Sequence, residues 1–282
     1  MARMLSCLVT VLIIMWGAEF TSADENLCTC TRGIWMQIGG GLKHVSVGRS
    51  GVWGVNGYGQ VYYRVDSYDD EENTGGTWVQ VIGGLKQVDV GRNVVWGVNN
   101  DDNIYYRQGI TDSTPRGTSW AQVDGALKHV SVSQKGHVWG VNAGDNIYHR
   151  IGASNCNVPG NSWLLISGGL KQISVGSGGV WGVNSADAIY YREGTFGDPD
   201  SDTDGSSWTH IPGMLKYVSS SDMIYGVNSG DAIFYRQGVS AGTPIGTGWQ
   251  HIDGSLQQIE FLSFAVWGVN AEDSIYVKEK DD

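Results

Sequence analysis

The composition of this chain of 282 residues excludes several classes of protein. Glycine accounts for 42 residues and charged residues for only 17%, yet there are 12 Trp and 13 Tyr. Such an aromatic content excludes a disordered acidic chain, and the glycines lack the three-residue period of collagen. A formal net charge of −11 excludes nucleic-acid binding through a basic surface and any general attraction for anionic membranes. Glycine together with β-branched and aromatic residues indicates short strands joined by tight turns.

The first element in chain order is a predicted secretory signal peptide over residues 1–23. Arg3 gives the positive start, residues 5–16 are mostly apolar, and Thr21 and Ala23 are the small residues that precede a cleavage site. The alternative is an N-terminal core helix. No second apolar stretch approaches the roughly 20 residues that span a bilayer, so we expect a secreted, extracellular protein without membrane insertion.

A predicted N-terminal arm, residues 24–34, carries two cysteines. With the signal removed, Cys28, Cys30 and Cys156 remain. An odd number in an oxidising compartment suggests an intermolecular bridge or a free thiol. Pairing Cys28 or Cys30 with Cys156 would tie the arm to the rest of the chain, and the sequence does not choose between them. The odd cysteine favours a covalent homodimer.

A repeat fills the chain from residue 35 to residue 278. The phrase V-W-G-V-N, or a close variant, occurs six times, and its aromatic residues lie 43, 43, 42, 44 and 42 residues apart. A relative of L-K-x-V-S-V precedes each phrase, and I-Y-x-R or a variant follows it. A second set of tryptophans stands alone between the phrases: Trp35, Trp78, Trp120, Trp163, Trp208 and Trp249.

Each repeat contains four short extended segments and no stretch with helical apolar spacing. Four strands in about 42 residues are typical of a propeller blade, so the sequence predicts an all-β fold, a six-bladed β-propeller of four-stranded blades. The chain starts with an isolated strand at residues 35–38 and ends in an I-Y-x-R-like strand, before a charged tail at 279–282. We therefore expect the N-terminal strand to pair into the last blade and close the ring.

The repeated pattern W-x-x-[IV], G-x-L-K-x-[IV]-S-V-G and V-W-G-V-N-x-x-D-x-I-Y-x-R is similar to the tectonin repeat. The chain most resembles the secreted fish-egg lectins, and more distantly tachylectin-1 of horseshoe crab, from about Trp35 to Lys278. The resemblance implies a six-bladed propeller that binds N-acetylglucosamine-type sugars and bacterial lipopolysaccharide, agglutinates cells and acts in egg or innate defence. Some members carry calcium near the central tunnel. This chain departs from the family in having fewer cysteines and in Tyr225, which replaces the fifth tryptophan.

The repeats supply the two things that a sugar site needs. A sugar ring stacks its apolar side on an aromatic face and binds fixed polar groups through its hydroxyls. The carbohydrate-binding candidates are Trp53, Asn56, Trp96, Asn99, Asp102, Arg107, Trp139, Asn142, Asp145, Trp181, Asn184, Asp187, Arg192, Asn228 and Asp231. The alternative is structural: the tryptophans would pack blade against blade, Asn and Asp would close their own turns, and Arg would stack on Trp or pair with Asp.

Long variable loops connect each Arg to the next isolated Trp, at residues 65–77, 108–119, 151–162, 193–207 and 237–248. In an antiparallel meander these loops share one face, and the turns after W-G-V-N share the other. Variable loops on a rigid repeat are a common place for binding, so we expect unequal sugar sites in the crevices between adjacent blades. Several weak sites would give avidity on a bacterial surface.

One of these loops contains a calcium-like pattern. Asp200, Asp202 and Asp204 precede Gly205 with the D-x-D-x-D-G spacing that opens a calcium loop, but the closing Glu is missing. The alternative is a solvated acidic loop. No cofactor is required by the sequence, and calcium is the one that this pattern favours.

We expect no enzymatic activity, because no catalytic motif occurs and the histidines are scattered. His44 and His129 stand where other repeats carry Gln87 and Gln172, which indicates a tolerant surface position. An inward pair of carboxylates across the ring stays an alternative, because sequence spacing does not show it. The sequence thus predicts a multivalent secreted lectin for glycans on bacterial or egg surfaces. The alternative is an extracellular protein-binding propeller scaffold without sugar specificity.

Overall fold

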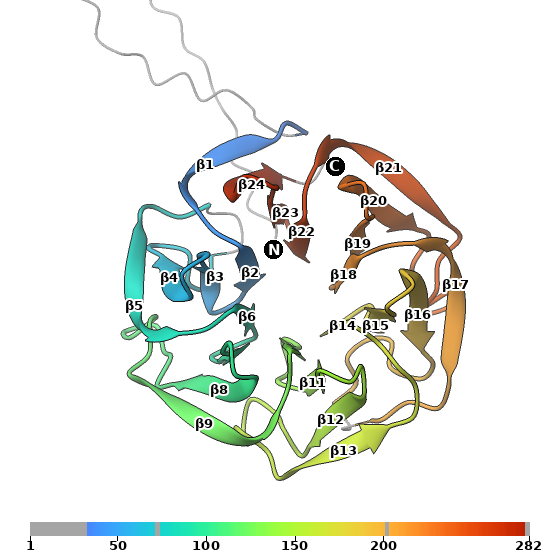
Figure 1. The fold of residues 1–282 in the computed structure, drawn as a ribbon, viewed down its shortest axis with the longest axis horizontal. Coiled ribbons are helices and arrows are strands. Elements are labelled where there is room, and N and C mark those ends of the chain that lie inside the picture. Colours follow the sequence, from blue (N-terminus) through green and yellow to red (C-terminus); the bar gives the residue numbers. More distant parts are fainter. Residues whose placement is uncertain (1–32, 71–73, 201–202, 280–282) are drawn as a thin grey trace, which may run out of the picture. The chain divides into compact units, whose positions relative to one another are not determined.

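A computed structural model describes residues 33–70, 74–200 and 203–279. These residues form a ring of six antiparallel sheets, each of four strands (Figure 1). The predicted six-bladed β-propeller is confirmed, and the described residues contain no helix. In the described part of the chain no helix is therefore long and apolar enough to cross a membrane.

The blades follow one another in chain order, and within each blade the strands run from the central axis outwards. Blades 1 to 3 consist of β2 (His44–Gly48), β3 (Gly51–Val55), β4 (Gln60–Arg64) and β5 (Trp78–Gly84); β6 (Gln87–Val90), β7 (Val95–Val98), β8 (Asn103–Gln108) and β9 (Ser119–Ala126); and β10 (His129–Val132), β11 (Val138–Val141), β12 (Ile147–Ile151) and β13 (Ser162–Ile166). Blades 4 to 6 consist of β14 (Gln172–Gly176), β15 (Gly179–Val183), β16 (Ala188–Arg192) and β17 (Trp208–Met214); β18 (Tyr217–Ser220), β19 (Ile224–Val227), β20 (Ala232–Gln237) and β21 (Gly248–Ser255); and β22 (Gln258–Leu262), β23 (Ala265–Val269), β24 (Ser274–Glu279) and β1 (Met36–Gly41).

The N-terminal strand closes the ring, as the phase of the repeat predicts. β1 pairs antiparallel with β24, with Met36 opposite Val277 and Ile38 opposite Ile275 (Figure 1). The next interface, between blades 6 and 1, is held by the Leu42 amide, which donates to the Asp273 carbonyl at 2.9 Å. The described residues thus leave no gap in the ring, and blade 6 contains both chain ends of the propeller.

The hydrophobic core lies between blades, in six clusters that each join neighbouring sheets. Trp53 and Val61 of blade 1, for example, pack with Leu85 and Val88 of blade 2. Packing requires the glycine of V-W-G-V-N, because a Cβ on Gly54 would lie 2.4 Å from the Leu42 side chain. The repeated phrase therefore encodes blade-to-blade packing.

Side chains satisfy the unpaired edges that the innermost strands present to the axis. The Gln258 amide donates to the Val45 carbonyl and accepts from the Val45 amide, at 2.8 and 3.1 Å. Gln87 and Gln172 hold Val130 and Val218 in the same way. Between the glutamines, the rings of His44, His129 and Tyr217 meet with centroids 5.8–6.2 Å apart.

The expectation that His44 and His129 occupy a tolerant surface position is therefore wrong. The repeat position alternates between a ring in odd blades and a glutamine in even blades. Three rings fill the axis, and three amides bind backbone. Correlated positions across a closed ring have no signature in sequence spacing, which explains the error.

Candidate functional site

The tryptophans of V-W-G-V-N lie in the core. Four of them were predicted as stacking faces for sugar, and each is at most 1% exposed: Trp53, Trp96, Trp139 and Trp181. Trp53 packs edge-on against Trp120 of the next blade, with ring centroids 6.4 Å apart. A sugar ring cannot reach these faces without opening the interface between blades. The structure gives no support to sugar contact at these positions and favours the packing alternative.

The predicted asparagines close the turns that follow V-W-G-V-N. The Asn99 side-chain oxygen accepts from the backbone amides of Asp101 and Asn103, at 3.0 and 2.8 Å. The same pair of bonds occurs at Asn56, Asn142, Asn184 and Asn228. Each asparagine therefore holds its own turn by side-chain-to-backbone bonds.

Asn99→Ala is expected to lower the unfolding free energy by about 1 kcal/mol, since two bonds to a partly exposed turn are lost. Because these bonds lie within the turn, sugar binding should not change. Denaturant unfolding and glycan binding of the same variant check both parts. A loss of glycan binding without a loss of stability would indicate that Asn99 contacts the ligand.

The predicted aspartates sit in the same turns and bind lysines. Asp102, Asp145, Asp187 and Asp231 have φ between 63° and 66°, a region that Asp tolerates better than most residues. Their carboxylates pair with Lys86, Lys128, Lys171 and Lys216 respectively. The hydrogen bond from Lys128 lowers the pKa of Asp145. Their carbonyls accept from the first leucine amide of the following blade, so these residues connect blades.

The predicted arginines anchor the long loops and cover the isolated tryptophans. Arg107 donates from Nε to the Arg116 carbonyl at 2.8 Å, and its guanidinium lies 5.3 Å from the centre of the Trp120 ring. Arg192 does the same with the Asp204 carbonyl and Trp208. Arg64, Arg150 and Arg236 repeat the arrangement in the other blades. This stack of cation on ring is found at five of the six isolated tryptophans.

The isolated tryptophans mark the interfaces between blades, which we call seams and number by their two blades. Each indole donates to a backbone carbonyl of the preceding blade; Trp120, for example, donates to Ile82 at 3.0 Å. All six rings are half-buried, so one part of each stays at the surface. These tryptophans thus present a partly accessible aromatic ring at every seam, and they were not among the predicted site residues.

A crevice of about 1140 Å³ opens at seam 1/2. It lies between residues 65–70 and the loop of residues 108–119. This is the face that carries the turn between β2 and β3, because the Asp69 amide donates to the Arg49 carbonyl at 2.8 Å. Its walls combine aromatic, apolar and charged side chains: Tyr63, Asp66, Tyr68, Asp70, Ile82, Arg107, Asp112, Arg116 and Trp120. Of the predicted site residues, only Arg107 lines it. The crevice is where the loops were expected to form a site.

Comparison with protein-family models matches the tectonin domain to residues 17–126 and 72–265. The chain belongs to the tectonin family. A comparison with curated protein sequences finds no match. No relative therefore supports the more specific resemblance to fish-egg lectins.

Solved structures with the same architecture share little sequence with the tectonin chain. Human WBSCR16 is 10% identical, with 86% of this chain and 78% of that chain covered and a TM-score of 0.52. YCF48 from Cyanidioschyzon merolae is 13% identical, with 83% and 81% covered and a TM-score of 0.51. The β-propeller domain of Cps50 (Swd1) from Myceliophteria thermophila is 8% identical, with 85% and 84% covered and a TM-score of 0.51. These similarities concern the fold alone.

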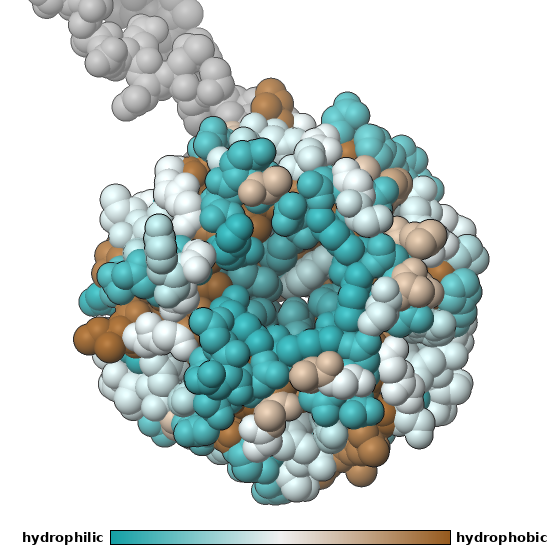
Figure 2. Space-filling view, viewed as in Figure 1, coloured by the Kyte–Doolittle hydropathy of each residue, from teal (hydrophilic) through white to brown (hydrophobic). Residues whose placement is uncertain are grey.

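The tectonin propeller has a second hollow at its axis, of about 470 Å³. Polar residues surround the central opening (Figure 2). Four carboxyl groups line this cavity, those of Asp89, Asp198, Asp222 and Glu260, and two of them, Asp89 and Glu260, lie on inner strands of blades 2 and 6. Sequence spacing left an inward pair of this kind open as an alternative, and the structure contains it.

Burial dominates the protonation of both carboxyl groups. It raises the pKa of Glu260 to about 8 and raises that of Asp89 as well, and the charge of Asp89 adds to the effect on Glu260. Asp89 accepts from Ser46 Oγ at 2.8 Å and from the Val132 amide at 2.7 Å. Glu260 accepts from the Tyr217 hydroxyl at 2.7 Å. Asp89 thus completes the hydrogen bonding of an inner strand, whereas Glu260 binds side chains.

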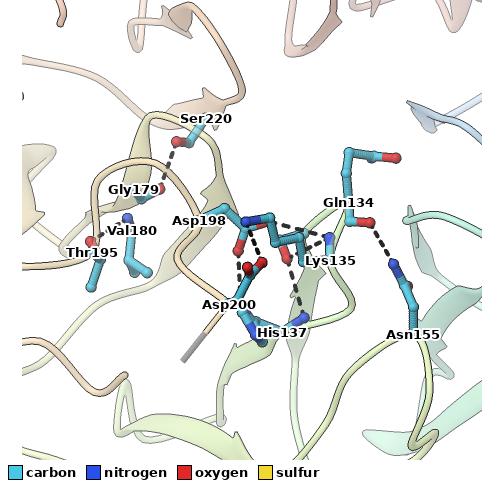
Figure 3. Close-up of polar contacts among 11 residues, drawn as sticks. Gln134, Lys135, His137, Asn155, Gly179, Val180, Thr195, Asp198, Asp200 and Ser220 are labelled. Carbon is cyan, nitrogen blue, oxygen red and sulfur yellow. Dashed lines mark hydrogen bonds and ion pairs between the residues drawn. The ribbon is translucent and has the colours of Figure 1, made fainter. Parts of the chain in front are cut away.

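The calcium-like loop of blade 4 binds side chains of blade 3 (Figure 3). Asp198 accepts from His137 Nδ1 at 2.8 Å, and Asp200 pairs with Lys135 Nζ at 2.7 Å. Asp204 accepts instead from His149 Nδ1, at 2.6 Å. Asp202 lies outside the described residues. Within the described ranges, no group of three or more His, Cys, Asp or Glu side chains is placed to hold a metal ion.

Cys156 is exposed, and it forms no disulfide with another described residue. It lies in the loop between β12 and β13. The preceding residue, Asn155, donates from its side chain to the Gln134 carbonyl at 2.8 Å (Figure 3). Cys28 and Cys30 lie outside the described residues, as do the predicted signal peptide and most of the predicted arm. The predicted disulfide and homodimer stay predictions.

Proposed function

We propose that this tectonin propeller is a secreted carbohydrate-binding protein whose saccharide sites are the seams between blades. The observation that carries the proposal is the crevice at seam 1/2. There the half-buried Trp120 ring lies beside the Arg107 guanidinium, and the loop hydroxyls of Ser113 and Thr118 line the same walls. An aromatic surface with a few fixed polar groups is the combination that binds a sugar ring.

The ligands proposed are N-acetylglucosamine-type sugars and bacterial lipopolysaccharide, as the resemblance to secreted lectins implies. Because the tryptophan recurs at six seams, one molecule would offer several unequal sites, and their combined avidity would suit a bacterial or egg surface. A role in innate or egg defence follows from that proposal.

Binding to a mixed array of glycans and lipopolysaccharide tests the proposal, with free N-acetylglucosamine as competitor and with calcium or a chelator present. Binding that the free sugar displaces would support it. Binding to neither class in either buffer would contradict it. Glycan binding that requires calcium would support an ion site in the acidic loop of blade 4.

Trp120→Leu is expected to reduce glycan binding at least tenfold, because it removes the aromatic surface of the crevice. The matched control is Trp78→Leu at seam 6/1. Both indoles donate to the preceding blade, at 3.0 Å, and both lie under an arginine, so their loss should cost similar stability. Thermal unfolding and glycan binding are measured on both variants. Equal loss of binding would contradict a dominant site at seam 1/2.

The alternative function is an extracellular scaffold for proteins. Leu164 and Leu165 on the outer strand β13 are 40% and 60% exposed, and apolar side chains at a sheet edge suit a protein partner. Such a partner would not be displaced by free N-acetylglucosamine, so the same competition experiment separates the two functions.

The function proposed is binding without catalysis. The buried histidines have structural partners: His44 and His129 fill the axis, His137 binds Asp198, and His149 stacks on Trp139 with centroids 4.4 Å apart. The inward carboxyl groups also have structural partners, since Asp89 accepts from the Val132 amide and Glu260 from the Tyr217 hydroxyl. Incubation with labelled glycans, followed by product analysis, tests this: any turnover that Glu260→Gln abolishes would contradict it.

A further inference from the structure

Five seams share one framework, and two positions beside it vary. The framework is the arginine stacked on the isolated tryptophan. The first variable position is the residue whose carbonyl accepts the indole, and the second is the residue whose carbonyl accepts the arginine Nε. In chain order these pairs are Gly39 and Thr74 at seam 6/1, Ile82 and Arg116 at seam 1/2, Asp124 and Pro159 at seam 2/3, Ser167 and Asp204 at seam 3/4, and Pro212 and Ile245 at seam 4/5.

The variable positions set the charge around the common guanidinium. At seam 2/3 the Asp124 carboxylate lies 2.8 Å from Arg150 Nη1, so its charge neutralises that arginine. At seam 3/4 the charge of Asp204 opposes the effect of burial, which lowers the pKa of Arg192. Both seams therefore supply an acidic group to the arginine.

Seam 1/2 differs, because it adds a second cation. Arg107 is only 8% exposed, and burial together with the positive charge of Arg116 lowers its pKa. Ile82, which stands where Asp124 stands at the next seam, is 91% exposed and offers no charge. Two guanidinium groups thus meet at one crevice in a chain with a net charge of −11.

Three carboxylates, those of Asp66, Asp70 and Asp112, also line the crevice. The Arg107 guanidinium lies 5.3 Å from the centre of the Trp120 ring, and the charge that acts on it is that of Arg116. Among the described residues no carboxylate pairs with Arg107, so the cationic part of the crevice lies beside Trp120.

We infer that the crevice at seam 1/2 prefers saccharides that carry an acidic group, either a carboxylate or a phosphate, and that Ile82 and Arg116 are its specificity-determining residues. This inference rests on the proposed function. The sugar ring would lie against Trp120 and Ile82, and its anionic group would accept charge-assisted hydrogen bonds from Arg107 and Arg116. A buried guanidinium without a carboxylate partner gains most from such an anion.

The test compares immobilised glycans that end in glucuronic acid, in glucose 6-phosphate and in glucose. Wild-type protein should bind one or both acidic glycans about tenfold more tightly than the neutral one, and the two acidic arms distinguish carboxylate from phosphate. Ile82→Asp should remove that preference by pairing with Arg107 as Asp124 pairs with Arg150. Ile82→Asn introduces a side chain of the same size as Asp but without its charge, and this variant should keep the preference for acidic glycans.

Asp124→Asn provides the converse test at seam 2/3, where it should free Arg150 and increase binding of the acidic glycans. Ile82 and Asp124 side chains are both exposed, so these variants should fold. Equal binding of acidic and neutral glycans by the wild type would overturn the inference and leave the proposed function standing. Equal retention of the preference in Ile82→Asp and Ile82→Asn would overturn the role of Ile82. No glycan binding at all would overturn both the inference and the proposed function.

Discussion

Deletion of residues 1–40 is expected to lower the melting temperature by more than 10 °C, or to prevent folding. The deletion removes most of β1, so blade 6 keeps three strands and β24 presents an open edge. It also removes Met36 and Ile38 from the cluster at seam 6/1, and the Trp35 indole that binds the Asp253 carbonyl at 2.7 Å. Burying each large apolar side chain contributes about 1.5–3 kcal/mol, and 1 kcal/mol shifts the melting temperature of a chain of this size by about 2–4 °C.

The matched control is deletion of residues 1–32, which leaves every described strand intact. This shorter deletion should melt like the mature protein. Thermal unfolding followed by circular dichroism compares the two. If the longer deletion also melts at the wild-type temperature, closure of the ring by β1 does not stabilise the propeller.

Stability is expected to peak near pH 6.5, because groups at the axis titrate in opposite directions. Burial lowers the pKa of His44 and of His129 from 6.5 to about 3, so both rings are neutral in the folded protein. As the pH falls below 6.5, the unfolded chain binds protons at these histidines and the folded protein does not. Each histidine therefore lowers the free energy of unfolding by about 1.4 kcal/mol per pH unit.

Glu260 has the opposite effect on the alkaline side. Its pKa rises from 4.5 to about 8 on folding, so between these values the folded protein keeps a proton that the unfolded chain releases. Stability falls as the pH rises through this window, and the full cost above pH 8 is about 5 kcal/mol. The raised pKa of Asp89 acts in the same direction. Below pH 6.5 the two histidines outweigh Glu260, which places the maximum near that pH.

Two variants separate these effects in urea unfolding measured from pH 4 to pH 9. Glu260→Gln should remove most of the alkaline loss and make the acid loss steeper, because Glu260 opposes the two histidines between pH 4.5 and 6.5. His44→Gln, which copies the residue of the even blades, should reduce the acid loss instead. A pH profile that neither variant changes would show that the axial groups do not control stability.

The fold could be predicted from the sequence because each blade repeats the same local pattern. V-W-G-V-N, I-Y-x-R and the isolated tryptophans recur in phase, and the spare strand at residues 35–38 fixes how the ring closes. The contents of the axis could not be predicted. Gln258 binds Val45 and Glu260 accepts from Tyr217 only because six inner strands converge, and this convergence is a property of the closed ring.

The sequence indicated where a crevice would form, and of the predicted site residues Arg107 lines it. The long loops indicated the crevices, and the crevice at seam 1/2 lies between two of them. The repeated Trp, Asn and Asp were chosen because they recur, yet recurrence here follows from packing and turns. Trp120 and Ile82 belong to the outer strands of neighbouring blades and lie 38 residues apart in the sequence. The packing of one blade against the next brings them together.

A crystal structure of the protein with a saccharide that it is shown to bind would locate the site directly. We expect the sugar to occupy seam 1/2, with its ring against Trp120 and its polar groups within hydrogen-bond distance of Arg107. A sugar found in the central cavity beside Asp89 and Glu260, with the seams empty, would contradict this expectation.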